Sequence, residues 1–243
     1  MSSCSATAIG EIGISVVELF CREETLIGAL IFDFDGLILD TETPEMRIWQ
    51  HLFAQAGGKF DVAAYQTIIG TYGSQTFQPA KELARLLDHG TTPEELWSLV
   101  QAKSIEAINQ EPALPGVVTL IAKAKHVGLS LGVGSSSPRE WVHGHLQRLA
   151  LLSQFDTIVT IDDVHVSKPE PDIFLKVLEN LAMPAEQALV LEDSYNGILA
   201  AQRAGIRAVA VPNPVTLGQD FSAAEEVLPS LNALQLEKYF SRS

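Results

Sequence analysis

The sequence predicts an α/β fold in which a parallel β-sheet, covered by helices on both faces, carries an inserted helical domain. In residues 28–42 and 111–243, short apolar runs of strand length alternate with helix-length patterns, as is typical of a parallel sheet with helical crossovers. Residues 43–110 interrupt this alternation directly after the first apolar run and contain helical patterns only. With 243 residues, of which 47% are hydrophobic, the chain is long enough for one core domain and a smaller insert, or cap.

Strands of the core are predicted where apolar runs, several of them rich in Val and Ile, are bounded by polar, Gly or Pro residues. In chain order these runs are Ala29–Phe34, Ser130–Val133, Thr157–Ile161, Ala188–Leu191 and Ala208–Val211. The core helices are predicted at Val117–His126, Pro138–Leu149, Asp172–Leu181 and Gly197–Ala204. Because the links between them are short, we expect helices on both faces of the sheet.

The insert is predicted to consist of helices separated by turns rich in glycine and proline. Its helical patterns cover Met46–Ala56, Ala63–Ile69, Gln75–Asp88 and Pro93–Asn109. Pro112 and Pro115 indicate an extended linker that returns to the core. Residues 1–27 have no counterpart in the alternation and are left without a role, although Glu11–Phe20 is predicted as a short amphipathic helix.

Composition excludes several classes of partner. The 16 basic and 30 acidic residues give a net charge of −14, which repels a phosphate backbone, so no nucleic-acid partner is expected. No apolar run reaches the roughly 18–20 residues that span a bilayer, so no membrane partner is expected. Two cysteines, Cys4 and Cys21, do not form a disulfide framework, and the first basic residue is Arg22. These features predict a cytoplasmic protein, in which an anionic substrate would need local positive charge at its site.

The first predicted strand ends in the acidic motif Asp33-Phe34-Asp35-Gly36. Ligands bind beyond the carboxyl ends of parallel strands, and the alternation of a strand places Asp33 and Asp35 on one face. Two neighbouring carboxylates repel each other unless they share a cation or a proton, and hard oxygen ligands favour Mg²⁺. Gly36 permits a sharp turn or a close approach to a ligand. The alternative is a structural turn in which the Asp side chains bind backbone amides.

Three further predicted strands lead to polar side chains. Ser135 and Ser136 follow the second strand at a helix start, where hydroxyl and N–H groups can hold a phosphate oxygen, while Ser137 and Glu140 fit a capping box. Lys168 lies in a proline-rich loop after the third strand and is either a site cation or a solvated loop residue. Glu192 and Asp193 follow the fourth strand, where they either complete an oxygen shell for a metal or interact with a helix dipole.

Taken together and in this order, the four motifs resemble those of the haloacid dehalogenase (HAD) superfamily, specifically its β-phosphoglucomutase-like phosphatases with a helical cap. The resemblance covers residues 28–215 and implies a HAD fold, with a Rossmann-like parallel sheet and an inserted α-helical cap. It implies a Mg²⁺-dependent phosphatase that hydrolyses a small phosphorylated metabolite through an aspartyl-phosphate, as a monomer or small homo-oligomer. The roles it implies are nucleophile for Asp33, general acid/base for Asp35, phosphate contacts for Ser135 and Lys168, substrate contacts for Gly36 and Ser136, and metal ligation for Asp33, Asp35, Glu192 and Asp193.

Single positions in the sequence distinguish the alternative functions. The family's sugar-phosphate mutases carry a His and an Arg in the cap, where this sequence has Glu45 and Gly73, so hydrolysis is favoured over a mutase reaction. A non-enzymatic binding protein on this scaffold would be expected to have lost one of the acidic or lysine positions, and none is lost. A dinucleotide-binding oxidoreductase would need a third glycine after Gly132-Val133-Gly134.

Overall fold

A computed structural model describes residues 26–70, 77–87 and 90–240. Its six strands form one sheet in the order β3-β2-β1-β4-β5-β6, and every neighbouring pair is parallel. The strands are β1 (Ala29–Phe32), β2 (Ser130–Gly134), β3 (Thr157–Val159), β4 (Ala188–Glu192), β5 (Arg207–Ala210) and β6 (Glu226–Val227). The five predicted strands and their parallel arrangement are thus confirmed. β6 was not predicted, because two residues are too short to show a periodic pattern.

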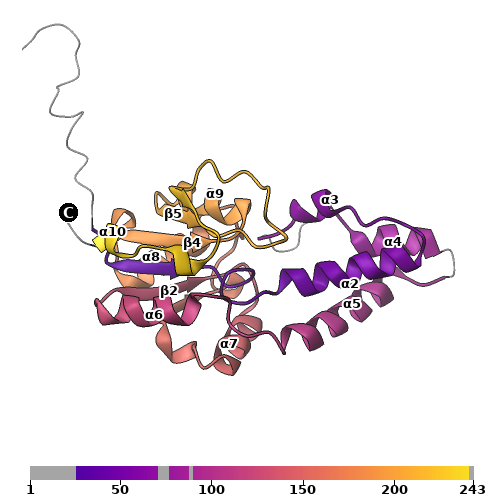
Figure 1. The fold of residues 1–243 in the computed structure, drawn as a ribbon, viewed down its shortest axis with the longest axis horizontal. Coiled ribbons are helices and arrows are strands. Elements are labelled where there is room, and N and C mark those ends of the chain that lie inside the picture. The colour runs from indigo at the N-terminus through magenta and orange to yellow at the C-terminus, as the bar shows by residue number, and fades with distance from the viewer. Residues whose placement is uncertain (1–25, 71–76, 88–89, 241–243) are drawn as a thin grey trace, which may run out of the picture.

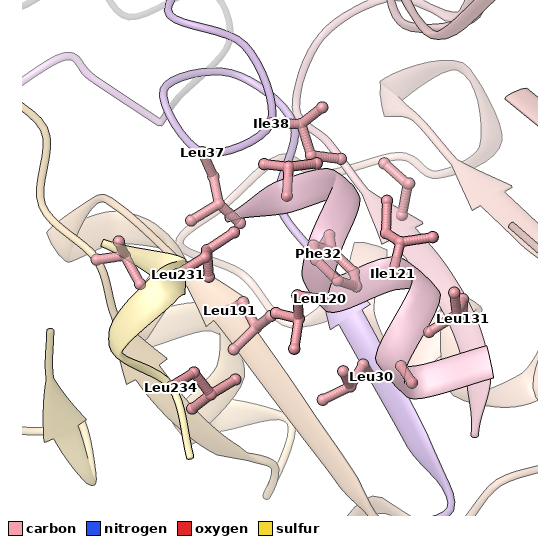
Figure 2. Close-up of a cluster of buried hydrophobic side chains, with 14 of the residues drawn as sticks. Leu30, Phe32, Leu37, Ile38, Leu120, Ile121, Leu131, Leu191, Leu231 and Leu234 are labelled. Carbon is pink, nitrogen blue, oxygen red and sulfur yellow. The ribbon is translucent and has the colours of Figure 1, made fainter. Parts of the chain in front are cut away.

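Helices cover both faces of this sheet (Figure 1). Alternate residues of β1 enter different hydrophobic clusters: Leu30 and Phe32 pack with the residues of α6 and α7, and Ile31 with those of α8 and α9. Figure 2 shows side chains of α6 lying over β1 and its neighbouring strands in the first cluster. The core helices are α6 (Val117–His126), α7 (Arg139–Arg148), α8 (Asp172–Leu181), α9 (Tyr195–Arg203) and α10 (Glu237–Phe240), with short 3-10 turns at Leu152–Gln154, Ile161–Asp163, Ala185–Gln187 and Leu231–Ala233.

The insert between β1 and α6 is helical, as predicted, and extends from one edge of the core (Figure 1). Its helices are α2 (Glu42–Gln55), α3 (Val62–Gln66), α4 (Pro79–Leu87) and α5 (Pro93–Ile108). They bury a hydrophobic cluster of their own, built around Trp49, Phe53 and Phe60, so the insert does not depend on the sheet alone for its packing. α2 begins four residues earlier than the pattern indicated, because the Asp40 carboxylate accepts the Thr43 N–H at the helix start.

The predicted helix at Glu11–Phe20 and the glycine at position 73 lie outside the described residues. Among the helices that the structure describes, none is long and apolar enough to cross a membrane. The sheet order reverses on either side of β1, since the chain runs from β1 to β2 and β3 and then returns to β4. Such a reversal leaves a crevice at the carboxyl ends of the strands, where ligands bind in open α/β sheets.

Candidate functional site

The predicted polar residues meet at the carboxyl edge of the sheet. Asp33 follows β1, Ser135 follows β2, and Glu192 ends β4, while Lys168 reaches the same edge from the connection between β3 and α8. All four are almost fully buried, with exposed fractions of 6% for Asp33, 0% for Ser135, 2% for Lys168 and 1% for Glu192. Charged side chains are buried to this degree only where they are paired or bind a ligand.

Lys168 is paired with two carboxylates. Its Nζ lies 2.5 Å from Asp33 Oδ1 and 2.7 Å from Glu192 Oε1. Burial by itself would lower the pKa of Lys168, but the charges of Asp33 and Glu192 outweigh this effect and raise the pKa above its ordinary value. Lys168 is therefore a permanent buried cation at the Asp33 carboxylate, and not a solvated loop residue.

Glu192 is held in place by the start of α9. Its Oε2 accepts the N–H groups of Asp193 and Ser194, each at 2.9 Å, and the Ser194 hydroxyl at 3.0 Å. With Lys168 on Oε1, the carboxylate accepts four hydrogen bonds, three of them on Oε2. A Cβ on Gly197 would lie 1.7 Å from Glu192 Oε1, so only glycine leaves room for this carboxylate.

Asp33, Glu192 and Asp193 form a buried acidic group. One carboxylate oxygen of each lies within 4.8 Å of the others. Burial raises the pKa of Asp33 and of Asp193 well above the ordinary range, and the neighbouring carboxylates add to the effect. In the described part of the chain, no donor contacts Asp33 Oδ2 or Asp193 Oδ1. Lys168 can offset only part of the negative charge of three carboxylates, and the two free oxygens suit a further cation.

Asp35 faces a different set of partners. Its Oδ2 accepts the hydroxyls of Ser137 at 2.7 Å and Ser135 at 3.2 Å, and its Oδ1 accepts the Trp141 indole N–H at 2.9 Å. Strand alternation does not extend to residue 35, because β1 ends at Phe32, but Asp33 and Asp35 still line the same cavity. The acidic group itself does not include Asp35.

The prediction that Ser137 and Glu140 form a capping box is wrong. α7 begins at Arg139 and has no side-chain cap from the preceding residue. The Ser137 hydroxyl binds Asp35 instead, since a hydrogen bond to a carboxylate is stronger than one to a backbone amide. The Arg139 N–H donates to the Asp162 carboxylate at 2.8 Å. This N–H group at the helix start therefore finds its acceptor in a segment that is remote in sequence.

Gly36 lies at the centre of the site, with a φ of +79°. A Cβ there would be 2.4 Å from Asp193 Oδ2 and 2.5 Å from Asn213 Nδ2. Asn213 donates to Asp193 Oδ2 at 2.7 Å and to Glu42 Oε2 at 2.9 Å. Burial raises the pKa of Glu42 well above its ordinary value, and the Asn213 hydrogen bond only partly opposes this.

Asn213 and Glu42 were not identified from the sequence. Asn213 follows the fifth predicted strand, so the rule that located the other site residues could have located it. Glu42 carries no such signal, because it precedes the predicted helix start and only the turn after Gly36 brings it to the site.

Comparison with known proteins identifies the fold. The family model of haloacid dehalogenase-like hydrolases matches residues 30–211. The chain belongs to this family. Across 211 residues it is 39% identical to YhcW of Bacillus subtilis (strain 168), covering 87% of this chain and 95% of that protein.

Two other relatives extend this comparison. Hexitol phosphatase B of Escherichia coli (strain K12) is 30% identical over 210 residues, covering 85% of this chain and 93% of the relative. The solved β-phosphoglucomutase of Clostridium difficile superposes with a TM-score of 0.67 at 25% identity, covering 88% of this chain and 95% of the other. The predicted family and fold class are confirmed, and so is the enzyme class of phosphoric monoester hydrolase. A non-enzymatic binding protein and a dinucleotide-binding oxidoreductase are disfavoured accordingly.

This haloacid dehalogenase-like hydrolase has a cavity of about 560 Å³ between the acidic edge and the cap. Asp33, Asp35 and Trp141 line its core end, and the cap contributes Glu45, Tyr65, Trp97, Gln101 and Ser104. Ser136 also lines it and donates its hydroxyl to the Gly70 carbonyl of the cap at 3.0 Å. No Lys, Arg or His is among the described lining residues. The cavity thus joins the acidic group to a pocket without positive charge of its own.

Proposed function

We propose that the chain is a Mg²⁺-dependent phosphatase that hydrolyses the monophosphate ester of a small metabolite, such as a sugar or polyol phosphate. The observation that carries this proposal is the buried Lys168, held 2.5 Å from Asp33, which belongs to the acidic group and lines the core end of the cavity. A relative named hexitol phosphatase B supports the same class of substrate.

Asp33 acts as the nucleophile. An oxygen of its carboxylate, which Lys168 contacts, attacks phosphorus; the ester P–O bond breaks, and the leaving oxygen takes the proton of Asp35. In the second step, water attacks the aspartyl-phosphate, gives a proton to Asp35, and releases inorganic phosphate and the Asp33 carboxylate. The sum is one ester and one water converted to one alcohol and one phosphate, and Asp35 returns to its starting state.

A divalent ion fits the acidic group, because its carboxylate oxygens are hard ligands that lie within 4.8 Å of one another. We assign Asp33 and Asp193 as the residues that would hold Mg²⁺, since both have an oxygen without a described donor. Both oxygens of Glu192 already accept hydrogen bonds, one of them from Lys168, while the Asp35 carboxylate is engaged by Ser135, Ser137 and Trp141. When bound, Mg²⁺ would supply positive charge for the phosphoryl oxygens.

Lys168 and the serines after β2 complete the proposed phosphate site. Lys168 offsets negative charge on Asp33 and on the incoming phosphoryl group. Ser136 and Ser137 line the cavity. Ser135 is proposed to act mainly by shaping this loop, because its hydroxyl is fully buried, accepts the Ser137 N–H at 3.0 Å and donates to Asp35.

Hydrolysis is favoured over the mutase alternative by the charge of the cavity. A mutase must bind a second phosphate, and neither the described lining nor the sequence of residues 71–76 contains a basic side chain. Glu45, which lines the cap end, accepts the Trp49 indole N–H at 3.1 Å. Its negative charge would repel a second phosphate and would accept hydrogen bonds from hydroxyl groups of a neutral leaving group.

Asp33→Asn tests this function. We expect the wild type to release phosphate from p-nitrophenyl phosphate only when Mg²⁺ is present, and the variant to stay folded with kcat lower by roughly 10³-fold or more. The exposed Asp220→Asn is the matched control and should keep wild-type turnover. Near-normal turnover in Asp33→Asn would exclude the nucleophile. Conversion of a hexose 1-phosphate to an isomeric phosphate, without free phosphate, would favour the mutase.

A further inference from the structure

Trp141, in the first turn of α7, contacts the active site through its indole N–H. We propose that Trp141 is a positioning residue that orients the Asp35 carboxyl group for proton transfer to the leaving group. This inference rests on the proposed phosphatase function and adds a residue that the sequence patterns did not indicate.

The Asp35 carboxyl group is held at both oxygens from one side. Trp141 Nε1 lies 2.9 Å from Oδ1, and Ser137 Oγ lies 2.7 Å from Oδ2. Ser135 Oγ contacts Oδ2 at 3.2 Å. Because all three donors come from α7 and the loop that precedes it, they hold the carboxyl group on that side of the site and fix its plane.

The three side chains differ in the hydrogen bonds that they can form with Asp35. An indole N–H can only donate, whereas a serine hydroxyl can donate or accept. Oδ1, in contact with Trp141, therefore stays an acceptor in both states of Asp35. The transferable proton resides on Oδ2, beside Ser137, a residue that lines the cavity. Trp141 thus determines which oxygen of Asp35 exchanges the proton with the substrate.

Trp141 is itself held by the rest of α7. Its ring packs edge-on against His145, with 4.3 Å between ring centroids and an interplanar angle of 74°. Arg148, on the same face of the helix, donates to the carbonyls of Ile108 and Glu111 at 3.3 Å and 2.9 Å, where the cap returns to the core. Residues 141, 145 and 148 therefore connect Asp35 with the base of the cap along one helix face.

Trp141 also forms part of the wall of two cavities. Trp141 lines both the active-site cavity and a second cavity of about 520 Å³, to which Asn109, Gly144 and Arg148 contribute. Alanine at position 141 would remove this part of the wall, to which Ile105 and Pro138 also contribute, and would change the solvent around Asp35. Phenylalanine keeps an aromatic side chain while it removes the N–H donor together with the five-membered ring, so Trp141→Phe is the informative variant.

The test compares esters that differ in their need for a proton. The p-nitrophenolate ion leaves readily without protonation, whereas phenolate from phenyl phosphate depends on a general acid. For both esters kcat/KM reports formation of the phosphoenzyme, so we expect Trp141→Phe to lower kcat/KM about tenfold or more for phenyl phosphate and about threefold or less for p-nitrophenyl phosphate. Tyr239→Phe, which removes a different aromatic donor far from the site, is the control and should leave both values unchanged.

Each outcome is decisive. A larger loss on phenyl phosphate supports the positioning role, because a general structural defect would affect both esters equally. Equal losses, or no loss, would overturn the role of Trp141 while leaving the phosphatase function intact. A wild type without activity on either ester would overturn the proposed function and this inference with it. Should Trp141→Phe not fold, Trp141→Leu, which also lacks a donor, carries the same comparison.

Discussion

Gly197→Ala is expected to destabilise the enzyme, although alanine is the better helix former. Gly197 lies inside α9, and a Cβ there would meet Glu192 Oε1 at 1.7 Å and Cδ at 1.8 Å. The Glu192 carboxylate would have to move away from Lys168 and from the three donors at the start of α9. Separating a buried ion pair costs about 3–5 kcal/mol. The higher helix propensity of alanine offsets about 1 kcal/mol of this loss in the free energy of unfolding.

The net loss is therefore about 2–4 kcal/mol, which lowers Tm by roughly 4–16 °C for a chain of this size. Gly144→Ala is the matched control, because Gly144 also lies inside a helix, α7, and its Cβ would meet nothing within 4 Å. We expect that variant to gain up to about 1 kcal/mol, or roughly 2–4 °C. Calorimetric unfolding of both variants measures the difference. A Gly197→Ala protein that unfolds at or above the wild-type temperature would refute the packing argument.

Two further predictions concern charge. Burial raises the pKa of Asp193 above its unfolded value, so the metal-free chain should lose stability as the pH rises above about 4. Asp193→Asn keeps an acceptor for Asn213. In urea unfolding with EDTA present, this variant should show a weaker dependence of stability on pH. Mg²⁺ should raise the Tm of the wild type but not of this variant, and an equal rise in both would exclude Asp193 as a ligand. In the cavity, wild-type kcat/KM should be about tenfold higher for a hexose monophosphate than for the bisphosphate. Glu45→Lys should lower this preference for the monophosphate, whereas Glu94→Lys, at an exposed position, should leave the preference unchanged. A wild type that hydrolyses both esters equally well would contradict the charge argument.

Much of the fold is encoded locally. The helices at Val117–His126 and Asp172–Leu181 have the bounds that their periodicity predicts. β1 and β4 are apolar on both faces because helices cover both, and such runs stand out in a sequence. A helix start inside the insert is also visible locally, since α5 begins with a capping box at Thr92 and Glu95.

The positions of the site residues along the chain are encoded in the same way. Asp33, Ser135, Lys168 and Glu192 each follow or end an apolar run, or lie in the loop after one, and parallel strands place their carboxyl ends at one edge. The sequence by itself therefore determined which residues meet, and through them the family and the chemistry that we propose.

The direction in which each side chain points was decided only by the tertiary structure. Asp35 accepts a hydrogen bond from Trp141, which is 106 residues away in the sequence. Ser137 donates to Asp35 and does not form the capping box that its neighbours in the sequence predicted. Asn213 and Glu42 meet across 171 residues. A sequence pattern records which residues are near one another along the chain, but hydrogen bonds in a buried site are chosen by charge and distance among segments that only folding brings together.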